Sequence, residues 1–360
     1  MMAVRPILIM AGGTGGHVFP ALAVADELRS RGVPIVWLGT RNGIEARVVK
    51  QAGYQIEWLS ITGLRGKNTV TLLLAPVRLF MACAQAFRVL WQRRPCAVLG
   101  MGGFASGPGG LMAWVMRRPL IIHEQNAVTG LTNRILSHLA GHVLQAFPDT
   151  FGKPAMTVGN PVRKEIQQLS DPKLRLSGHT GALRVLVIGG SLGAVRLNEI
   201  VPQAISRMAA GARPEILHQT GLANLDATRE CYQQHGVEAR IEAFIDDMAE
   251  VYGWADLVIC RAGAMTVFEL AAAGVASILI PYPHAVDDHQ TANAEYLVKA
   301  GAAVVMQQHE LSSEWLSDTI SRLTLERDTL IRMAVAARNM AKPNAANEVA
   351  DICMQAGGLT

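Results

Sequence analysis

The sequence lacks the features that mark several common classes of protein. It contains five cysteines, an odd number, and they are widely spaced with no C-x-x-C pair. We therefore expect neither a disulfide framework nor a zinc site, and a protein of a reducing compartment. Its apolar runs, such as Val275–Ile280, are far shorter than the ~20 residues of a membrane-spanning helix. No signal-peptide core precedes the first glycine cluster, so we predict a cytoplasmic location.

Acidic residues are missing from one long segment. No Asp or Glu occurs between Glu57 and Glu124. The same segment carries eight basic residues, namely Arg65, Lys67, Arg78, Arg88, Arg93, Arg94, Arg117 and Arg118. The whole chain has a net charge of only +4, so the remainder is net negative. This asymmetry predicts an anionic partner for the basic segment.

An approximate internal duplication is present. Pro6–Gly16 and Arg184–Gly193 each consist of an apolar run followed by a glycine cluster, and each leads into a segment with helical periodicity. Both patterns predict a buried parallel strand, a tight turn and an amphipathic helix. Gly12 and Gly189 are 177 residues apart, close to half the chain. We therefore predict two similar α/β halves.

Further short apolar runs fit parallel strands. They are Ile35–Leu38, Ala97–Gly100, Leu120–His123, Val143–Gln145, Glu215–Gln219, Ala255–Cys260, Ser277–Pro281 and Ala303–Met306. Helical patterns or glycine loops separate most of them, which predicts doubly wound sheets with helices on both faces. The polar segment Pro161–Gly181 loses this periodicity, so we place the domain linker there. One large domain, or three, remain the alternatives.

Three glycine-rich turns follow predicted strands, at Ala11–Gly16, Gly100–Gly110 and Gly189–Gly193. Such turns bring backbone N–H groups close to phosphate oxygens, although tight packing alone also explains them. Neither a P-loop nor the G-x-G-x-x-G spacing after the first strand occurs. The second strand leads to Arg41 instead of the acidic residue that binds an NAD ribose, which disfavours a dehydrogenase but leaves NADP open.

The segment Cys260–Gly274 is the richest candidate for nucleotide binding. Gly263 and Thr266 lie near a predicted helix start that suits a diphosphate. Glu269, just inside that helix, has a carboxylate that could accept two ribose hydroxyl hydrogen bonds, or could simply complement the helix dipole. The following polar loop, Pro281–Asn293, suits sugar hydroxyls. A metal site there, from His284, Asp287, Asp288 and His289, is disfavoured because no ligand pair has a spacing that fixes geometry.

Taken together and in order, these motifs resemble the MurG family of bacterial peptidoglycan glycosyltransferases. The matching segments are Gly12–Pro20, Gly63–Gly66, Gly100–Gly110, His123–Asn126, Gly159–Arg163, Gly189–Ser191, Phe244–Met248, Arg261–Gly274, Asp287–Gln290 and Asn293. The resemblance covers nearly the whole chain. It implies a GT-B fold with two Rossmann-like domains facing across a cleft. We predict an N-terminal domain at 1–163, a C-terminal domain at 164–342, and a last helix at 343–360 that returns to the N-terminal domain.

The resemblance also implies site residues. For the donor nucleotide, Ile245 would meet the uracil and Glu269 the ribose. The diphosphate or sugar would contact Ser191, Arg163, Arg261, Gln290 and the helix start Ala264, Met265, Thr266, Val267 and Phe268. Thr14, Gly15, Gly16 and Asn126 would approach the donor from the other domain. The acceptor diphosphate would lie on Gly12, Gly13, Gly102, Gly103 and Phe104. His17 is the first candidate for the general base, because it follows the first glycine loop and the unperturbed pKa of a histidine side chain is near neutrality. His123 and Glu124 are the alternatives.

Three positions depart from the family pattern. Leu192 stands where we expect glutamine, Phe104 where tyrosine is common, and Val275-Ala276 lacks the usual proline. Polar contacts from these side chains are therefore in doubt, whereas backbone contacts would be preserved.

The implied reaction is an inverting transfer of GlcNAc from UDP-GlcNAc to the C4 hydroxyl of undecaprenyl-diphospho-MurNAc-pentapeptide, which converts lipid I to lipid II. We expect no cofactor, no metal and no nucleic acid, and cell-wall synthesis proteins as possible partners. Two alternatives stay open. One is another GT-B enzyme, acting on a soluble acceptor or as an epimerase, and the other is a non-catalytic or NADP-dependent nucleotide-binding protein.

The basic stretch 65–94 then acquires a predicted role. Within Thr69–Arg94, apolar residues recur at helical spacing, namely Leu73, Val77, Phe80, Met81, Ala84, Phe87 and Trp91. An acceptor with a polyprenyl tail stays in the bilayer, so we predict that this helix binds the anionic cytoplasmic face of the inner membrane peripherally. A core helix with arginines reaching to solvent is the alternative.

Overall fold

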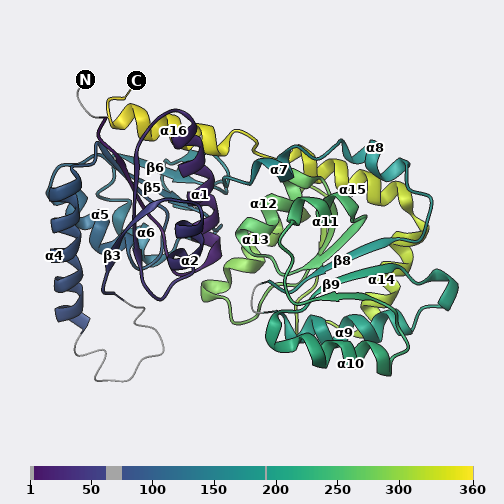
Figure 1. The fold of residues 1–360 in the computed structure, drawn as a ribbon. Coiled ribbons are helices and arrows are strands. Elements are labelled where there is room, and N and C mark those ends of the chain that lie inside the picture. Colours follow the sequence, from purple (N-terminus) through teal and green to yellow (C-terminus); the bar gives the residue numbers. More distant parts are fainter. Residues whose placement is uncertain (1–3, 62–74, 191–192, 360) are drawn as a thin grey trace. The chain divides into compact units, whose positions relative to one another are not determined.

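The computed structural model describes residues 4–61, 75–190 and 193–359, and the chain divides into two compact units. Unit 1 is Met1–Val162 with Lys342–Thr360, and unit 2 is Arg163–Ala341. Each unit is built on one parallel sheet with helices on both faces (Figure 1). The predicted α/β class with two parallel sheets is confirmed.

The sheet of unit 1 has seven strands in the order β3-β2-β1-β4-β5-β6-β7, and all neighbours are parallel. The strands are β1 Ile7–Met10, β2 Ile35–Thr40, β3 Gln55–Leu59, β4 Ala97–Gly100, β5 Leu120–Glu124, β6 His142–Gln145 and β7 Met156–Thr157. The strand order reverses between β1 and β4, so the loops after these two strands diverge from the sheet and leave room for a ligand.

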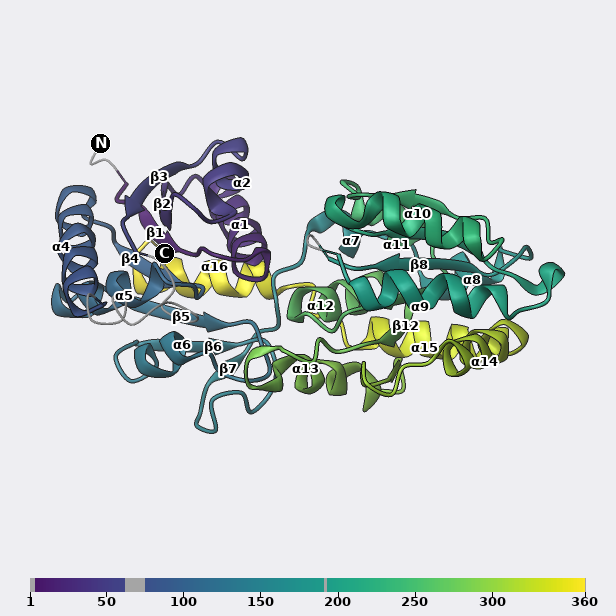
Figure 2. The ribbon, with the colours of Figure 1, turned by 90° about the horizontal axis from the view of Figure 1, so that it is seen from below.

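In the described part of unit 1, six helices cover the two faces of this sheet. They are α1 Gly15–Ser30, α2 Glu45–Gln51, α4 Ala75–Arg93, α5 Ser106–Val115, α6 Leu131–Leu136 and α16 Ala345–Ala356. Buried residues of α1 and α16 form one core with residues on one face of β1 and β4. Buried residues of α4, α5 and α6 form a second core on the opposite face of the sheet. The chain's last helix therefore lies beside its first one (Figure 2). Val349 and Ala350 of α16 are fully buried in that core.

Unit 2 repeats the arrangement with six parallel strands in the order β10-β9-β8-β11-β12-β13. They are β8 Arg184–Ile188, β9 Glu215–Gln219, β10 Arg240–Glu242, β11 Leu257–Cys260, β12 Ala276–Leu279 and β13 Ala303–Val305. The helices are α7 Lys164–Gln167, α8 Pro172–Ser177, α9 Val195–Ser206, α10 Leu225–Gln234, α11 Met248–Trp254, α12 Ala264–Ala273, α13 His289–Val298, α14 Ser313–Leu325 and α15 Arg327–Asn339. Short 3-10 turns are Ala210–Ala212, Leu222–Asn224 and Val286–Asp288.

The segment for which we predict a linker, Pro161–Gly181, contains the passage between the units and also two short helices. The chain leaves unit 1 after Val162, and α7 and α8 then pack against α12 and α15 within unit 2. Asp171 caps α8 by accepting a hydrogen bond from the Lys173 N–H at 2.8 Å, with Pro172 in the first turn. Polar short helices show no clear periodicity, so the sequence alone does not distinguish them from a loop.

Among the helices that the structure describes, none combines the length and apolar character needed to cross a bilayer.

Candidate functional site

The two glycine loops of unit 1 lie against each other at the carboxyl ends of β1 and β4. The first is the Ala11–Thr14 turn, and the second contains Gly102 and Gly103, both with φ in the left-handed region (95° and 82°). A Cβ on Gly103 would lie 2.2 Å from the carbonyl oxygen of Gly12, so only glycine permits this approach. Phe104 follows with half of its side chain exposed. The structure thus brings together the five residues for which we predict acceptor contacts.

Helix α1 begins at this loop, and no side chain caps its first backbone N–H groups. Its N-cap residue is Thr14, whose side chain makes no capping hydrogen bond, and its first turn contains no acidic residue. Gly15 and Gly16 are the first two residues of the helix; a Cβ on Gly16 would meet only the Thr14 hydroxyl at 3.7 Å, whereas the Phe19 ring lies against Gly15. An uncapped helix start with exposed backbone donors is a common binding place for phosphate.

The buried carboxylate of Glu45, which was not predicted, is hydrogen-bonded to the first glycine loop. Glu45 is fully buried, and its carboxylate accepts hydrogen bonds from the N–H of Gly13 (3.0 Å), the N–H of Thr40 (2.9 Å) and the hydroxyl of Thr40 (2.7 Å). A Cβ on Gly12 or Gly43 would lie within 2.5 Å of this carboxylate. In the sequence Glu45 looks like an ordinary first-turn glutamate of α2, and only its position under the loop distinguishes it.

Replacing Glu45 with glutamine should destabilise unit 1. The amide of glutamine would turn an N–H group towards either Gly13 or Thr40, and a buried donor without an acceptor costs about 1–3 kcal/mol. We expect that loss in the free energy of unfolding measured with urea. Glu348→Gln on α16, an exposed first-turn glutamate of the same unit, is the matched control and should stay within about 0.5 kcal/mol of the parent. Equal effects of the two changes would contradict this account.

Two histidines of unit 1 are joined through a glutamine. His17 Nδ1 lies 2.8 Å from Gln125 Oε1, Gln125 Nε2 lies 3.0 Å from His123 Nδ1, and His123 Nε2 lies 2.9 Å from the carbonyl oxygen of Gly159. His123 is fully buried, and this burial lowers its pKa to about 4. It is therefore neutral at physiological pH. Gln125 belongs to the motif His123–Asn126 but was not among the predicted site residues.

Glu124 holds the loop after β5. It is almost completely buried, and its carboxylate accepts hydrogen bonds from the N–H of Asn126 (3.0 Å), the N–H of Gly130 (3.1 Å) and the side-chain amide of Asn133 (2.9 Å). These donors occupy most of the lone pairs of the carboxylate. The geometry therefore favours a loop-positioning role for Glu124 over proton transfer, and it fixes Asn126 at the strand end.

In unit 2, helix α12 also begins without a side-chain cap. Gly263 is its N-cap residue, and no acidic residue occurs in the first turn. Ala264 is buried, while Met265 and Thr266 are partly exposed. Val267 and Phe268 are buried in the unit, where Phe268 stacks on Tyr296, and the Val267 N–H donates to the carbonyl oxygen of Gly263, so neither side chain is available to a ligand.

Glu269 follows on α12, and its carboxylate has two partners. Arg163 Nη2 lies 3.3 Å from Oε1, and the Tyr252 hydroxyl donates to Oε2 at 3.2 Å. Its side chain is only 14% exposed, and this burial raises its pKa even though Arg163 acts in the opposite direction. The predicted ribose and diphosphate residues Glu269 and Arg163 are thus brought together in unit 2.

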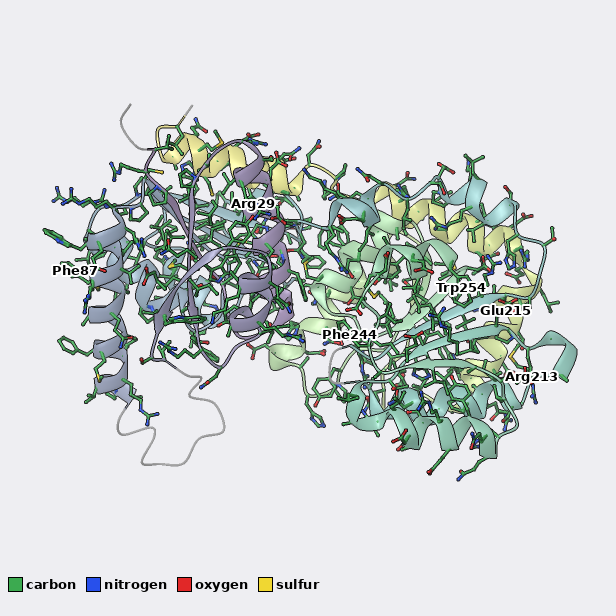
Figure 3. All side chains as sticks on the ribbon, viewed as in Figure 1. Arg29, Phe87, Arg213, Glu215, Phe244 and Trp254 are labelled. Atoms are coloured by element: carbon green, nitrogen blue, oxygen red, sulfur yellow. The ribbon has the colours of Figure 1, made fainter. Side chains whose placement is uncertain are left out.

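The other predicted donor residues have mixed surroundings. Ile245 is buried in the loop between β10 and α11, next to Phe244, which is half exposed (Figure 3). Arg261 Nη1 donates to the carbonyl oxygens of Ile280 (3.1 Å) and Pro281 (3.2 Å), so it shapes the loop after β12. Burial lowers the pKa of Arg261.

Gln290 and Ser191 complete the predicted donor set. Gln290 Oε1 accepts a hydrogen bond from the N–H of Tyr282 at 2.9 Å, which leaves its amide nitrogen for a ligand. Ser191, together with Leu192, lies outside the described residues. Within the described part of the chain, no three His, Cys, Asp or Glu side chains group as metal ligands.

Comparison with known proteins decides the family. Residues 7–145 match the glycosyltransferase family 28 N-terminal domain, and residues 184–349 match the family 28 C-terminal domain. A crystal structure of Acinetobacter baumannii MurG is 41% identical and superimposes with a TM-score of 0.85, covering 98% of this chain and 99% of that one. The chain belongs to the MurG family.

Curated members of the MurG family are closer still. The proteins from Nitrosococcus oceani and Methylococcus capsulatus are each 54% identical over 356 residues, covering 98% of this chain and 99% of theirs. Both are named UDP-N-acetylglucosamine–N-acetylmuramyl-(pentapeptide) pyrophosphoryl-undecaprenol N-acetylglucosamine transferase. The predicted family and the predicted GT-B type of fold are confirmed.

More distant structures share only the fold. The calicheamicin glycosyltransferase CalG4 is 17% identical with a TM-score of 0.69, covering 99% of each chain. The UDP-GlcNAc 2-epimerase of Neisseria meningitidis is 12% identical with a TM-score of 0.67, covering 97% of this chain and 99% of that one. Membership of the MurG family therefore rests on the closer relatives.

Proposed function

We propose that this chain transfers GlcNAc from UDP-GlcNAc to the C4 hydroxyl of polyprenyl-diphosphate-linked MurNAc-pentapeptide, the conversion of lipid I to lipid II in peptidoglycan synthesis. The observation that carries the proposal is the full-length identity of 54% to relatives named for this transfer. The site geometry is compatible, because each unit places an uncapped helix start and a glycine turn at the carboxyl edge of its sheet.

We assign the donor to unit 2 and the acceptor to unit 1. In unit 2 the uracil would contact Ile245, the ribose would bind Glu269, and the diphosphate would lie at the start of α12 beside Arg163. In unit 1 the two glycine loops would hold the acceptor diphosphate. The support is that diphosphates are stabilised by converging backbone N–H groups and that a carboxylate suits two vicinal hydroxyls.

The reaction then needs charge stabilisation and a base. As the acceptor hydroxyl oxygen bonds to the anomeric carbon, the bond to UDP breaks and negative charge grows on its diphosphate. The α12 helix start and the Arg163 guanidinium stabilise that charge. His17 takes the hydroxyl proton, because Glu124 is engaged by its loop and His123 is fully buried.

The deciding experiment uses the full chain with labelled UDP-GlcNAc and a polyprenyl-diphospho-MurNAc acceptor. We expect label to appear in a disaccharide-lipid product. Turnover of UDP-GlcNAc without any acceptor would instead identify an epimerase or hydrolase, and a thermal shift with NADP but not with UDP would identify a different nucleotide-binding protein.

We propose further that α4 docks this enzyme on the cytoplasmic face of the inner membrane. Leu73 lies outside the described residues, and the other apolar residues predicted to form one stripe of this helix are solvent-exposed. The buried side of α4 is formed by Ala82, Ala86, Val89 and Leu90. Val77 (56% exposed), Phe80 (74%), Met81 (52%) and Trp91 (61%) lie on the open side. Phe87 lies on the outer side of α4 as well (Figure 3). Such exposure of large apolar side chains is typical of an interaction surface and not of a core helix.

Basic side chains accompany this apolar surface. A cavity of about 600 Å³ beside the C-terminal end of α4 is lined by Arg5, Phe87, Trp91, Arg94, Met116 and Arg118. Its described lining thus combines three guanidinium groups with apolar side chains and includes no carboxylate. This combination supports binding of anionic lipid headgroups. Residues 65–74 of the predicted basic stretch lie outside the described residues.

Reversing two exposed charges on α4 should release the protein from membranes. With Arg78→Glu and Arg88→Glu together, we expect at least about a tenfold loss of binding to anionic vesicles in sedimentation, because each basic residue near the surface contributes about 1 kcal/mol. Affinity for UDP should not change. The matched control reverses Arg207 and Arg229, which are half exposed in unit 2. Unchanged sedimentation of the α4 variant would refute the docking proposal.

A further inference from the structure

Gln125 joins His17 to His123 through its side-chain amide. We propose that Gln125 is a positioning residue that fixes the tautomer of His17 and leaves Nε2 of His17 as the basic nitrogen. This inference deepens the proposed function and rests on it for the role of His17 in transfer. The tautomer itself is a property of the chain without substrates.

The donors and acceptors in this chain of hydrogen bonds can be assigned from the carbonyl oxygen of Gly159. The carbonyl oxygen of Gly159 can only accept, so the Nε2 of His123, 2.9 Å away, carries a hydrogen. Burial lowers the pKa of His123 to about 4, so its ring is neutral and its Nδ1 must accept. The amide nitrogen of Gln125 supplies that hydrogen at 3.0 Å and donates its second hydrogen to the main-chain oxygen of His123 at 3.1 Å.

The orientation of the amide then decides the state of His17. With both hydrogens of Gln125 directed at His123, its Oε1 faces His17 and can only accept. The His17 Nδ1, 2.8 Å from this oxygen, therefore carries the ring hydrogen. In neutral His17 the lone pair is left on Nε2. Free neutral histidine prefers the opposite tautomer, so the protein holds the less common form.

Packing holds the ring of His17 in this position. A Cβ placed on Gly102 would lie 2.8 Å from both Cε1 and Nδ1 of His17, so the glycine loop closes over this edge of the ring. Glycine at position 102 therefore leaves the room that the Nδ1 edge of the His17 ring occupies beside Gln125. During transfer, Nε2 accepts the proton of the acceptor hydroxyl, and Oε1 of Gln125 stabilises the imidazolium that forms.

The test measures the tautomer and the kinetics of the same variants. Imidazole ¹H–¹⁵N spectra of the full chain, assigned with His17→Ala and recorded where His17 is neutral, should show hydrogen on Nδ1. In Gln125→Met, of similar volume but without an acceptor, we expect the Nε2–H form to appear and kcat to fall about 10- to 100-fold with the KM for UDP-GlcNAc unchanged. Gln125→Glu retains an acceptor towards His17, so it should restore the Nδ1–H form and part of the lost kcat.

Gln51→Met is the matched control, because it makes the same replacement at an exposed position at the end of α2 in the same unit, outside the chain of hydrogen bonds. It should keep the parental tautomer and kcat. Hydrogen on Nε2 of His17 in the parent, or full kcat in a folded Gln125→Met variant, would overturn the inference. If Gln125→Met does not fold, the parental spectrum decides alone. An Nδ1–H tautomer in a parent that transfers no GlcNAc would leave the tautomer assignment intact and refute the proposed function.

Discussion

Replacing Glu269 with alanine should raise the dissociation constant for UDP about 100-fold or more. In our assignment the carboxylate accepts both ribose hydroxyls, and each charge-assisted hydrogen bond contributes about 1.5–3 kcal/mol. The change also removes the partner of Arg163, which lies 3.3 Å from the carboxylate. Isothermal titration calorimetry with UDP measures the effect directly and does not depend on any acceptor.

Two control variants test whether the loss of UDP affinity comes from the carboxylate of Glu269. Glu250→Ala on α11 removes an exposed glutamate of the same unit and should leave the affinity unchanged. Tyr252→Phe removes only the hydroxyl that donates to Glu269 Oε2, so its effect should be much smaller than that of Glu269→Ala. An alanine variant that binds UDP like the parent would refute the assignment of the ribose to Glu269.

The affinity for UDP should also depend on pH through Glu269. Burial raises the pKa of this carboxyl above the usual value of 4.5, so its charged form is lost at a higher pH than for an exposed glutamate. A protonated carboxyl accepts fewer hydrogen bonds, and affinity should therefore fall as the pH is lowered through that raised pKa. Glu269→Gln should remove this pH dependence from the calorimetric titration.

Replacing His17 with alanine should lower kcat about 10²- to 10⁴-fold, the usual contribution of a general base. The dissociation constant for UDP should not change, because our assignment places the nucleotide on unit 2. Transfer of labelled GlcNAc to the lipid acceptor measures kcat. The matched control is His142→Ala, an exposed histidine at the start of β6 in the same unit. A His17→Ala variant with parental kcat would exclude His17 as the base.

The sequence was most reliable for the central strands. Ala97–Gly100 and Glu215–Gln219 were predicted with the bounds that the structure gives to β4 and β9. Ala97–Gly100 is buried along its whole length and forms a continuous apolar run, whereas in Glu215–Gln219 only Ile216 and Leu217 are apolar. The strands β3, β7 and β10 were missed. All three lie at sheet edges. Gln55–Leu59 and Arg240–Glu242 mix polar and apolar residues, and Met156–Thr157 has only two residues, so their patterns differ little from that of a loop.

For the candidate site, the sequence indicated the loops but not the supporting contacts. The glycine clusters could be recognised in the sequence because tight turns after strands need the positive φ angles and close backbone approach that glycine permits. Glu45 and Gln125 were not predicted, because their importance lies in partners 32 and 108 residues away. A hydrogen bond between distant segments leaves no local signal in a single sequence.

The sequence by itself determined the family and the two α/β sheets, and it supplied candidate residues for phosphate and sugar binding that stay predictions. Only the tertiary structure decided which side of α4 is exposed, which carboxylates are held by their loops, and how His17 is hydrogen-bonded. The physical reason is that periodicity and composition specify which segments can be buried. Partners, burial and the direction of hydrogen bonds are set when strands far apart in the chain bring their loops to the same edge of a sheet.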